Sequence, residues 1–492
     1  MVKQRGVSNE RNVQPKDAGS VYVERIERQW DVEINRTVRF VGAKRERTLT
    51  GWGLTMPSSA DVLSVFDDAE VHDAVLSSSD RGVLARGAGR SYGDAAQNGG
   101  GLVLDLMGRT SFEIADDGSV TAYAGVVLGD LIPELIARGR FLPVTAGTRY
   151  ITVGGAIAAD VHGKNHHRDG AFGDHVRWIE LITADGTLHR LARDGSFDDQ
   201  RIFYATLGGM GLTGVILRAC FDTIPALTSA VRVDTERFND LDSLMAAMVS
   251  GDDRYRYSVA WVDGTAKGGK LGRGVLTRGD HADVAEIYGQ APRAIPTGDA
   301  PKLASPPIPM SPLNRLSIGM FNEAYFRRAP KLRVGEIQSL ASFFYPLDVL
   351  AGWNRVYGRG GFLQYQFAVP DAGAEVVRTS LEQLGSIGAP SFLSVLKRFG
   401  PGRTRSPLSF PIHGWTLAID VPTRVDGLAE VLDGLDELVL AAGGRLYLAK
   451  DSRMSPRTLE RGYPQLNEFR AVKFDLDPRG VFTSDLARRL QI

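Results

Sequence analysis

Residues 86–94, Arg-Gly-Ala-Gly-Arg-Ser-Tyr-Gly-Asp, follow the apolar run Gly82 to Ala85, which predicts a buried strand that ends in a glycine-rich loop. Glycine lets a backbone approach a phosphate closely and present N–H groups to it. Residues 82–101, 147–173 and 208–214 together hold 17 of the 56 glycines within 54 positions. This clustering predicts one large phosphate-bearing cofactor held by several loops of one domain.

Three familiar motifs match these glycine patterns poorly. Residues 87–93 begin like a dinucleotide fingerprint, but the third glycine is one position late and residues 94–101 do not form an amphipathic helix. The segment Gly89-x-Ser91-x-Gly93 has the spacing of a hydrolase nucleophile, which also needs a following helix, an acid and a histidine. A serine hydrolase acting through Ser91 stays the alternative from another class. Gly264-x-x-x-x-Gly269-Lys270 is followed by Leu271 and lacks the hydroxyl of a phosphate-binding P-loop.

Composition excludes several classes of protein. The chain has 58 basic and 58 acidic residues, which argues against nucleic acid as the main partner. Cys220 is the only cysteine, so an internal disulfide framework and a cysteine-based zinc site are excluded. No run of residues approaches the roughly 18 apolar positions of a membrane span. Residues 1–48 carry 11 basic and 7 acidic side chains without the apolar core of a secretory signal, which predicts a charged extension that is solvated or contacts anionic surfaces.

The remaining sequence predicts a mixed α+β protein with a second, antiparallel sheet. We expect strands at 102–106, 176–183 and 214–220 and a helix at 128–137. Seven prolines within 292–312 predict an irregular, mobile loop. Alternation in the later strands 362–369, 393–399 and 416–421 groups residues by face. Gln364 and Gln366 share a face, as do Val395, Lys397 and Phe399, and as do Thr416, Ala418 and Asp420.

Three of the eight histidines, His162, His166 and His167, lie within six residues. Gly163 and Lys164 between them suit a polar loop or contact with an anionic ligand better than a helical metal site. The residues alone leave these readings open, and we expect no metal.

Taken together, the motifs resemble a known family. RGAGRSYGD (86–94), TVGGAIAADVHGKNHH (152–167) and GGMGLTGVI (208–216) resemble the flavin-binding loops of the vanillyl-alcohol-oxidase type of FAD enzymes. HGKNHH (162–167), WNRVYG (353–358), GFLQYQF (361–367), LSFPIHGW (408–415) and GGRLYLAKDSR (443–453) resemble the branch that oxidises a polyprenyl-phosphate ribose. The resemblance runs from about residue 50 onward. It implies an FAD-binding domain at 49–225, a substrate domain at 226–444 and a segment at 445–492 that returns to the FAD-binding domain.

The resemblance also implies the cofactor contacts. Many relatives tether FAD through a histidine at the position of Arg90, so this chain is expected to hold FAD non-covalently. The implied FAD contacts are Ala85, Arg86, Gly87, Ala88, Gly89, Arg90, Ser91, Tyr92, Gly93, Asp94, Ala95, Gly147, Thr152, Val153, Gly154, Gly155, Ala159, Asp160, Val161, His162, Ile216 and Tyr447.

The implied substrate pocket combines amides for ribose hydroxyls with lysines for a phosphate. Its residues are His162, Lys164, Trp261, Gln364, Gln366, Lys397 and Lys450. Lys450 is expected to be the catalytic base, provided that burial or neighbouring cations lower its pKa; a contact to the phosphate is the alternative. Strict alternation puts Tyr447 and Lys450 on opposite faces, so the strand is expected to end or bulge between them.

The implied reaction is FAD-dependent oxidation of the ribose 2-hydroxyl of decaprenylphosphoryl-β-D-ribose to the 2-keto sugar. In the family this is the first half of an epimerisation that supplies arabinose for cell-wall arabinan, and a separate NADH-dependent short-chain reductase completes it. The resemblance further implies membrane-surface contact in the cell envelope, at the periplasmic face of the plasma membrane. The alternative within the same fold is a soluble sugar or alditol oxidase.

Overall fold

The computed structural model describes residues 44–288, 303–304, 313–402 and 405–492. Gly42–Ile492 form one compact unit. Most of the expected extension 1–48 lies outside the described residues, and its last residues, 45–48, lie in strand β1 (Arg45–Leu49). β1 is an exposed edge strand, where charged side chains are well tolerated, so charge alone did not reveal a strand.

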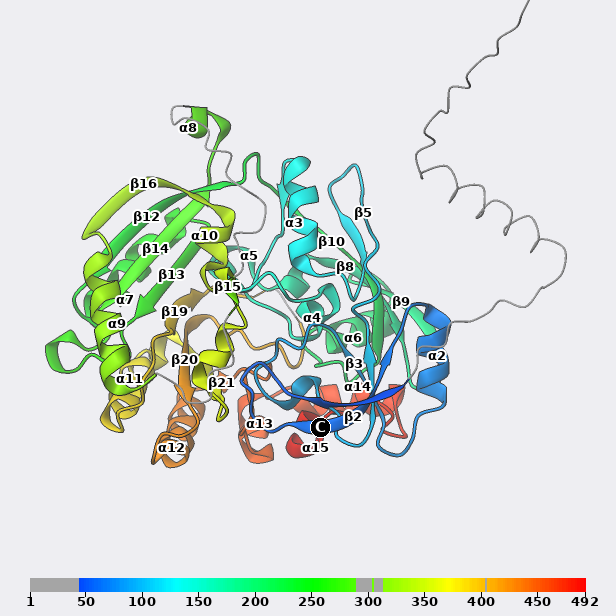
Figure 1. Cartoon of the computed structure of the whole chain (residues 1–492). Coiled ribbons are helices and arrows are strands. Elements are labelled where there is room, and N and C mark those ends of the chain that lie inside the picture. Colours follow the sequence, from blue (N-terminus) through cyan, green and yellow to red (C-terminus); the bar gives the residue numbers. More distant parts are fainter. Residues whose placement is uncertain (1–43, 289–302, 305–312, 403–404) are drawn as a thin grey trace, which may run out of the picture. The chain divides into compact units, whose positions relative to one another are not determined.

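The first sheet positions the glycine loop, which follows one of its strands (Figure 1). Its order is β1-β2-β4-β3, with β2 (Ser58–Ser64), β4 (Leu102–Asp105) and β3 (Val83–Arg86) parallel and β1 antiparallel. Helix α2 (Asp68–Leu76), capped by Asp67, joins β2 to β3. The strands expected before and after the glycine loop are confirmed, and the loop leaves the carboxyl end of β3.

The second sheet is antiparallel, with five strands in the order β5-β6-β10-β8-β9. The strands expected at 176–183 and 214–220 are confirmed as β8 and β10, and the expected helix is α3. The elements of this region are β5 (Phe112–Ile114), β6 (Val120–Tyr123), α3 (Leu128–Ala137), β7 (Arg140–Phe141), α4 (Val153–Ala158), α5 (His166–Asp169), β8 (Val176–Ile182), β9 (Leu188–Ala192), α6 (Phe197–Thr206), β10 (Val215–Phe221) and β11 (Ile224–Pro225).

The third sheet has eight strands, and all of its neighbouring strands are antiparallel, as expected for the later half of the chain. Their order is β16 (Leu332–Ser339), β12 (Ala230–Phe238), β14 (Gly274–His281), β13 (Tyr257–Val262), β19 (Ser394–Phe399), β20 (Gly414–Pro422), β18 (Phe362–Pro370) and β21 (Arg445–Leu446). Around it lie α7 (Leu241–Gly251), α8 (Val284–Tyr288), α9 (Arg315–Arg328), α10 (Leu340–Phe344), α11 (Glu375–Ser386) and α12 (Leu428–Ala441).

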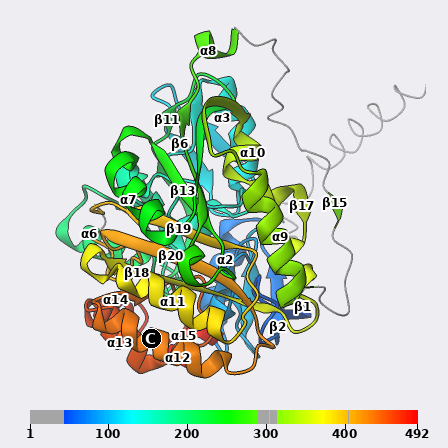
Figure 2. The ribbon, with the colours of Figure 1, turned by 90° about the vertical axis from the view of Figure 1, so that its left-hand side faces the viewer.

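The two faces of this large sheet differ in chemistry. Helices α7, α11 and α12 cover one face, and α7 and α11 stand in front of its strands in Figure 2. Alternate residues of β18 and β20, such as Phe367 and Leu417, pack in the core beneath these helices. The intervening residues, including Gln366 and Thr416, therefore lie on the opposite face. The expected grouping of side chains by face is confirmed.

The segment after β21 returns to the first sheet. Helices α13 (Pro456–Gly462), α14 (Leu466–Leu476) and α15 (Asp485–Leu490) follow, and Phe482 bridges to Val83 of β3. β21 ends at Leu446, and the Lys450 N–H donates to the Tyr447 carbonyl (2.9 Å), so the strand gives way to a turn as expected.

Most of the proline-rich loop 292–312 lies outside the described residues; within it Leu303–Ala304 form β15, paired with β17 (Leu350–Ala351). In the described part of the chain, no helix is long and apolar enough to cross a membrane.

Candidate active site

The first glycine loop, residues 87–93, presents backbone N–H groups without a described partner, and we call it the glycine cradle. No described group accepts a hydrogen bond from the N–H groups of residues 87–91, although these residues are only partly exposed. A Cβ on Gly87 would lie 2.2 Å from Thr152 Oγ1, and one on Gly93 would lie 1.9 Å from the Asp451 carbonyl oxygen. Glycine is thus required for the loop to fit against its neighbours, while its row of available N–H groups suits a pyrophosphate.

A second stretch of small residues lies beside this loop. Thr152 caps α4 by accepting from the Gly155 N–H (3.1 Å), and a Cβ on Gly154 would come 2.8 Å from the Ala124 Cβ. Gly147 has no atom within 4 Å of the place where its Cβ would lie, so packing within the protein does not explain it. Gly147 is exposed, so this open space is solvent, and only Gly154 is required by close packing.

Three of the expected cofactor residues have side chains that are engaged elsewhere. The Asp160 carboxylate accepts from the Gly173 N–H (2.9 Å) and the Ser409 hydroxyl (2.5 Å), and Val153 is fully buried in the core. The Asp94 carboxylate binds Arg489. These residues would contact a cofactor through their backbones.

Arg90, at the position of the tether in relatives, stacks on aromatic rings. Its guanidinium lies 4.1 Å from the centre of the Trp52 ring and 5.6 Å from that of Tyr150. Its Nε is buried without a partner among the described residues, and burial lowers its pKa. A guanidinium held this way offers a cation and a donor at the loop.

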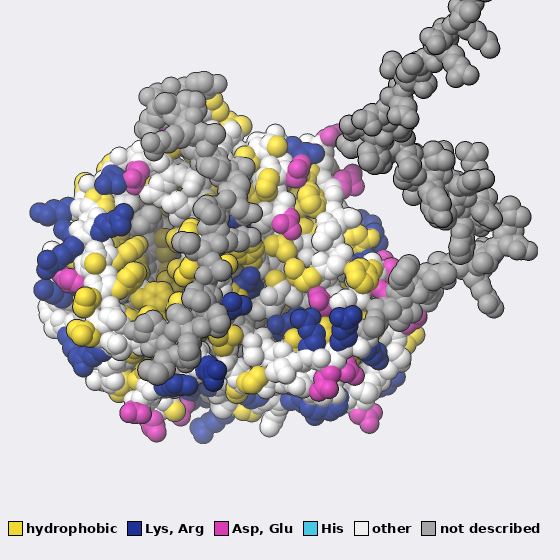
Figure 3. Space-filling view, in the orientation of Figure 1, with side chains coloured by type: hydrophobic (Ala, Val, Ile, Leu, Met, Phe, Trp, Pro, Cys, Tyr) yellow, Lys and Arg dark blue, Asp and Glu magenta, His cyan; other side chains and the backbone are white. Residues whose placement is uncertain are grey.

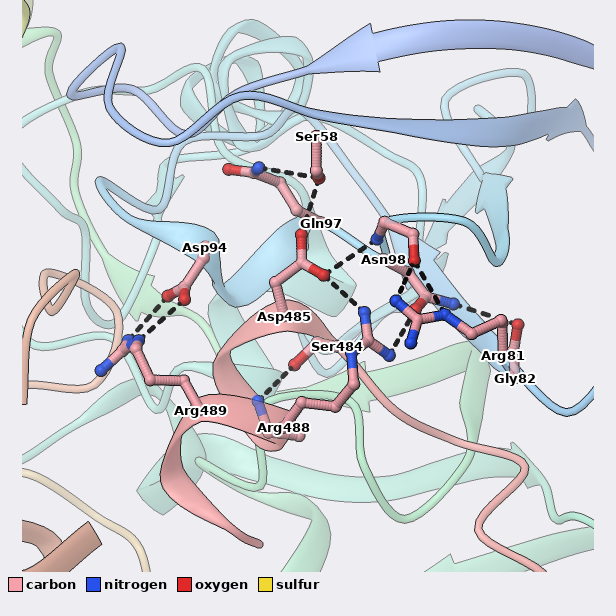
Figure 4. Close-up of polar contacts among 12 residues, drawn as sticks. Ser58, Arg81, Gly82, Asp94, Gln97, Asn98, Ser484, Asp485, Arg488 and Arg489 are labelled. Atoms are coloured by element: carbon pink, nitrogen blue, oxygen red, sulfur yellow. Dashed lines mark hydrogen bonds and ion pairs between the residues drawn. The ribbon is translucent and has the colours of Figure 1, made fainter. Parts of the chain in front are cut away.

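Helix α15 fastens the glycine loop to the returning segment (Figure 4). Arg489 donates to both carboxylate oxygens of Asp94 (2.9 and 2.8 Å) and lies 2.8 Å from Asp451. Asp485 accepts from Ser58 Oγ (2.6 Å) and from the Gly99 N–H (2.9 Å), and Arg488 donates to Asn98. We call Asp485, Arg488 and Arg489 of α15, together with the groups that they bind, the α15 clamp. Sequence reasoning missed it, because no local pattern links residues so far apart.

His162 packs against the face of the large sheet that bears Gln366 and Lys397. Its Nδ1 is 3.2 Å from Lys397 Nζ, and its Nε2 is 3.0 Å from the Gln366 amide nitrogen. Burial, followed by the charge of Lys397, holds the pKa of His162 well below its usual value. The ring is therefore neutral at physiological pH and contributes hydrogen bonds rather than charge.

Three half-buried lysines, Lys164, Lys397 and Lys450, lie near this histidine. Lys164 donates to the Phe343 carbonyl and lies over the Phe343 ring, and burial with the charge of Lys397 lowers its pKa to about 7. Burial lowers the pKa of Lys397 to about 8. The Lys450 ammonium lies 3.7 Å from the centre of the Tyr92 ring. Burial lowers the pKa of Lys450, while the Asp420 charge opposes this shift. Such a pocket offers both an anion site and a lysine that loses its proton readily.

Asp420 is a residue that sequence reasoning left without a role. It is fully buried, accepts from the Gln364 amide (2.5 Å), and burial raises its pKa. Gln364 also donates to the Tyr92 hydroxyl (3.2 Å), which connects Asp420 to the ring beneath Lys450. The period of two had already placed Asp420 beside Ala418, and its pairing opposite Gln364 was the missing information.

Three further residues were expected in the site: Trp261, Tyr447 and Ile216. Trp261 lies on the same face and donates to the Phe392 carbonyl (3.0 Å). Tyr447 donates to the Ala159 carbonyl (2.8 Å) beside His162, and Ile216 lies buried in β10.

The three clustered histidines have different partners. His162 and His166 both pack on Phe399, and His167 contacts the Tyr255 carbonyl. Among the described residues, no group of three or more His, Cys, Asp or Glu could hold a metal. Around Ser91 the chain runs from β3 through the loop into a single helical turn, Asp94–Ala96, which lacks the strand–turn–helix geometry of a hydrolase nucleophile.

Comparisons with known proteins point the same way as this geometry. A family profile described as FAD binding domain matches residues 62–192, and one described as D-arabinono-1,4-lactone oxidase matches residues 424–490. Decaprenylphosphoryl-β-D-ribose oxidase of Mycolicibacterium smegmatis is 42% identical over 454 residues, which cover 91% of this chain and 98% of that protein. Alditol oxidase of a Streptomyces species is 25% identical over 90% of this chain and 98% of its own length.

Proposed function

Because the chain belongs to the decaprenylphosphoryl-β-D-ribose oxidase family, we propose that it is an FAD-dependent oxidase of a polyprenyl-phosphate ribose. The reaction is oxidation of the ribose 2-hydroxyl of decaprenylphosphoryl-β-D-ribose to the 2-keto sugar, as a step of arabinan synthesis for the cell wall. The observation that carries the proposal is that the glycine loop, through Tyr92, contacts a face of the large sheet that bears two buried amides, and that three half-buried lysines lie there.

Different residues of the site have different roles in this reaction. When bound, FAD supplies the acceptor for the hydride that leaves ribose C2. Lys450, as a neutral amine, takes the proton of the 2-hydroxyl, and Lys164 and Lys397 attract the phosphate. Gln364 and Gln366 bind ribose hydroxyls, and the neutral His162 ring accepts a hydrogen bond from the Gln366 amide, while its other ring nitrogen lies 3.2 Å from Lys397.

The cofactor is expected to be held without a covalent bond, because Arg90 replaces the tethering histidine and stacks on Trp52. Acid precipitation should then leave all of the flavin in the supernatant, measured by its absorbance. Flavin that stays with the precipitated protein would contradict this expectation.

The keto sugar is a reactive intermediate, and a separate NADH-dependent reductase would return it as the arabinose epimer. A lipid-linked substrate also requires contact with a membrane surface, and we place the protein at the periplasmic face of the plasma membrane.

Anaerobic bleaching of the bound flavin tests the function. Decaprenylphosphoryl ribose should bleach a yellow protein, while a free alditol such as xylitol should not. Bleaching by the alditol alone would favour the alternative, a sugar or alditol oxidase. The 25% identity of this chain to alditol oxidase supports testing that alternative. A colourless protein that hydrolyses esters would favour the Ser91 hydrolase.

The pH at which the rate of flavin reduction rises should shift in opposite directions in two variants, Asp420→Asn and Lys397→Met. Lys450 acts when neutral, so the rate at saturating substrate should rise with pH as this lysine loses its proton. Asp420→Asn removes a negative charge that raises the pKa of Lys450, so the rise should shift to lower pH. Lys397→Met removes a positive charge that lowers the pKa of Lys450, so the rise should shift to higher pH.

Each shift is expected to be about one pH unit, the scale for a charge a few ångströms away. Stopped-flow reduction rates across pH measure both shifts. Profiles that coincide with that of the wild type in both variants would show that Lys450 is not the titrating base.

A further inference from the structure

Helix α9 presents an apolar face to solvent although its opposite face is well packed. Ile318, Asn322 and Phe326 are buried, and the Asn322 amide donates to Asp263 (2.8 Å) and to the Ser391 carbonyl (3.1 Å). Its outer face carries four large side chains with high exposed fractions: Leu316 at 74%, Met320 at 66%, Phe321 at 50% and Tyr325 at 44%. No charged residue interrupts this face from Leu316 to Tyr325, since Ser317 and Ala324 complete it. We call these residues the α9 outer face.

Ring contacts join the α9 outer face to the proposed pocket. The Trp261 ring lies 4.7 Å from that of Tyr325, centre to centre, and Tyr325 stacks with Phe321 at 6.2 Å. Phe321 meets Phe392 edge to face at 6.0 Å, and the Phe392 carbonyl accepts from the Trp261 indole. An apolar surface therefore continues from Trp261 out to the exposed helix.

Strand register extends the same surface inward to the amides. Trp261 lies directly opposite Val395, Val395 opposite Ala418, and Ala418 opposite Gln366. Residues opposite each other in antiparallel strands share a face, so this row runs from a ribose-binding amide through two small apolar side chains to Trp261. Figure 3 shows hydrophobic side chains gathered in a hollow left of centre, where Figure 1 shows the large sheet.

Resting on the proposed function, we propose that the polyprenyl chain of the substrate runs along this row, leaves the pocket past Trp261 and lies across the α9 outer face. The substrate is an amphiphile with an anionic head and a long hydrocarbon tail. The protein matches this order, with half-buried lysines at one end of the row and an uncharged apolar helix face at the other. Covering exposed apolar surface of this kind with a hydrocarbon chain removes it from water, which is energetically favourable.

The test compares two substrates that differ in tail length. Decaprenylphosphoryl ribose and geranylphosphoryl ribose, which has a two-unit tail, are presented to the holoenzyme at one fixed detergent concentration. The double variant Met320→Ser/Phe321→Ser changes exposed side chains, so it should fold. Its kcat/KM for the decaprenyl substrate should fall at least tenfold, while that for the geranyl substrate should stay within twofold. Phe197→Ser, at a residue of α6 that is 82% exposed, is the control and should alter neither value.

Four other outcomes decide against the inference. Equal losses with both substrates, or no loss with either, would overturn the proposed tail path and leave the proposed function standing. Sedimentation showing a wild-type dimer that the double variant converts to a monomer would assign the α9 outer face to a second copy of the chain instead. A wild-type enzyme whose flavin neither substrate reduces would overturn the proposed function, and the inference with it.

Discussion

Replacing Lys450 by methionine is expected to lower the rate of flavin reduction by substrate about 10²–10⁴-fold, the usual contribution of a positioned base, while FAD stays bound. Methionine keeps the length and apolar stem of lysine but cannot accept a proton. The ammonium lies over the Tyr92 ring but makes no hydrogen bond to the backbone of residues 86–94, so its loss should leave the conformation of that loop unchanged. Stopped-flow reduction measures the rate, and the absorbance spectrum measures bound FAD.

Lys473→Met is the matched control, because Lys473 is a lysine of α14 whose side chain is 13% exposed and pairs with Asp477 outside the pocket. It should reduce its flavin at the wild-type rate. The alternative role for Lys450, contact with the phosphate, predicts a different result. The Lys450→Met variant would then show a raised KM with a nearly unchanged rate at saturating substrate, and that result would remove the assignment of Lys450 as base.

Replacing Arg489 by methionine is expected to lower the free energy of unfolding by about 3–5 kcal/mol, the usual cost of removing one partner of a buried ion pair. The carboxylate side chains of Asp94 and Asp451 are 3% and 4% exposed, and both would lose their cation. Asp94 directly follows the glycine cradle, so the variant should also lose FAD. Thermal unfolding and the ratio of flavin to protein after gel filtration measure the two effects.

Arg470→Met serves as the control for this variant. Arg470 lies in α14 and pairs with Glu460, which is 56% exposed, so the change should cost less than about 1 kcal/mol and leave the flavin ratio unchanged. An Arg489→Met protein that keeps wild-type flavin content and stability would show that the α15 clamp does not hold the cradle.

Local periodicity predicted the parts of the site that lie along single strands. Alternation alone placed Gln364 with Gln366 and Lys397 with Val395. The conflict between Tyr447 and Lys450 predicted a strand that ends or bulges between them, and β21 already ends at Leu446, one residue before Tyr447. The pairing of Gln364 with Asp420 needs the register of two strands, which alternation does not supply. Asp94 and Arg489 are 395 residues apart, so only the folded chain reveals their contact.

The α15 clamp has a consequence for the order in which the protein matures. During synthesis the glycine cradle emerges nearly four hundred residues before the arginine that fixes Asp94. A nascent chain therefore carries every residue of the first cofactor loop long before that loop can take its final shape. Stable capture of the cofactor should await release of α15 from the ribosome, which makes flavin loading a checkpoint on the folding of the whole unit.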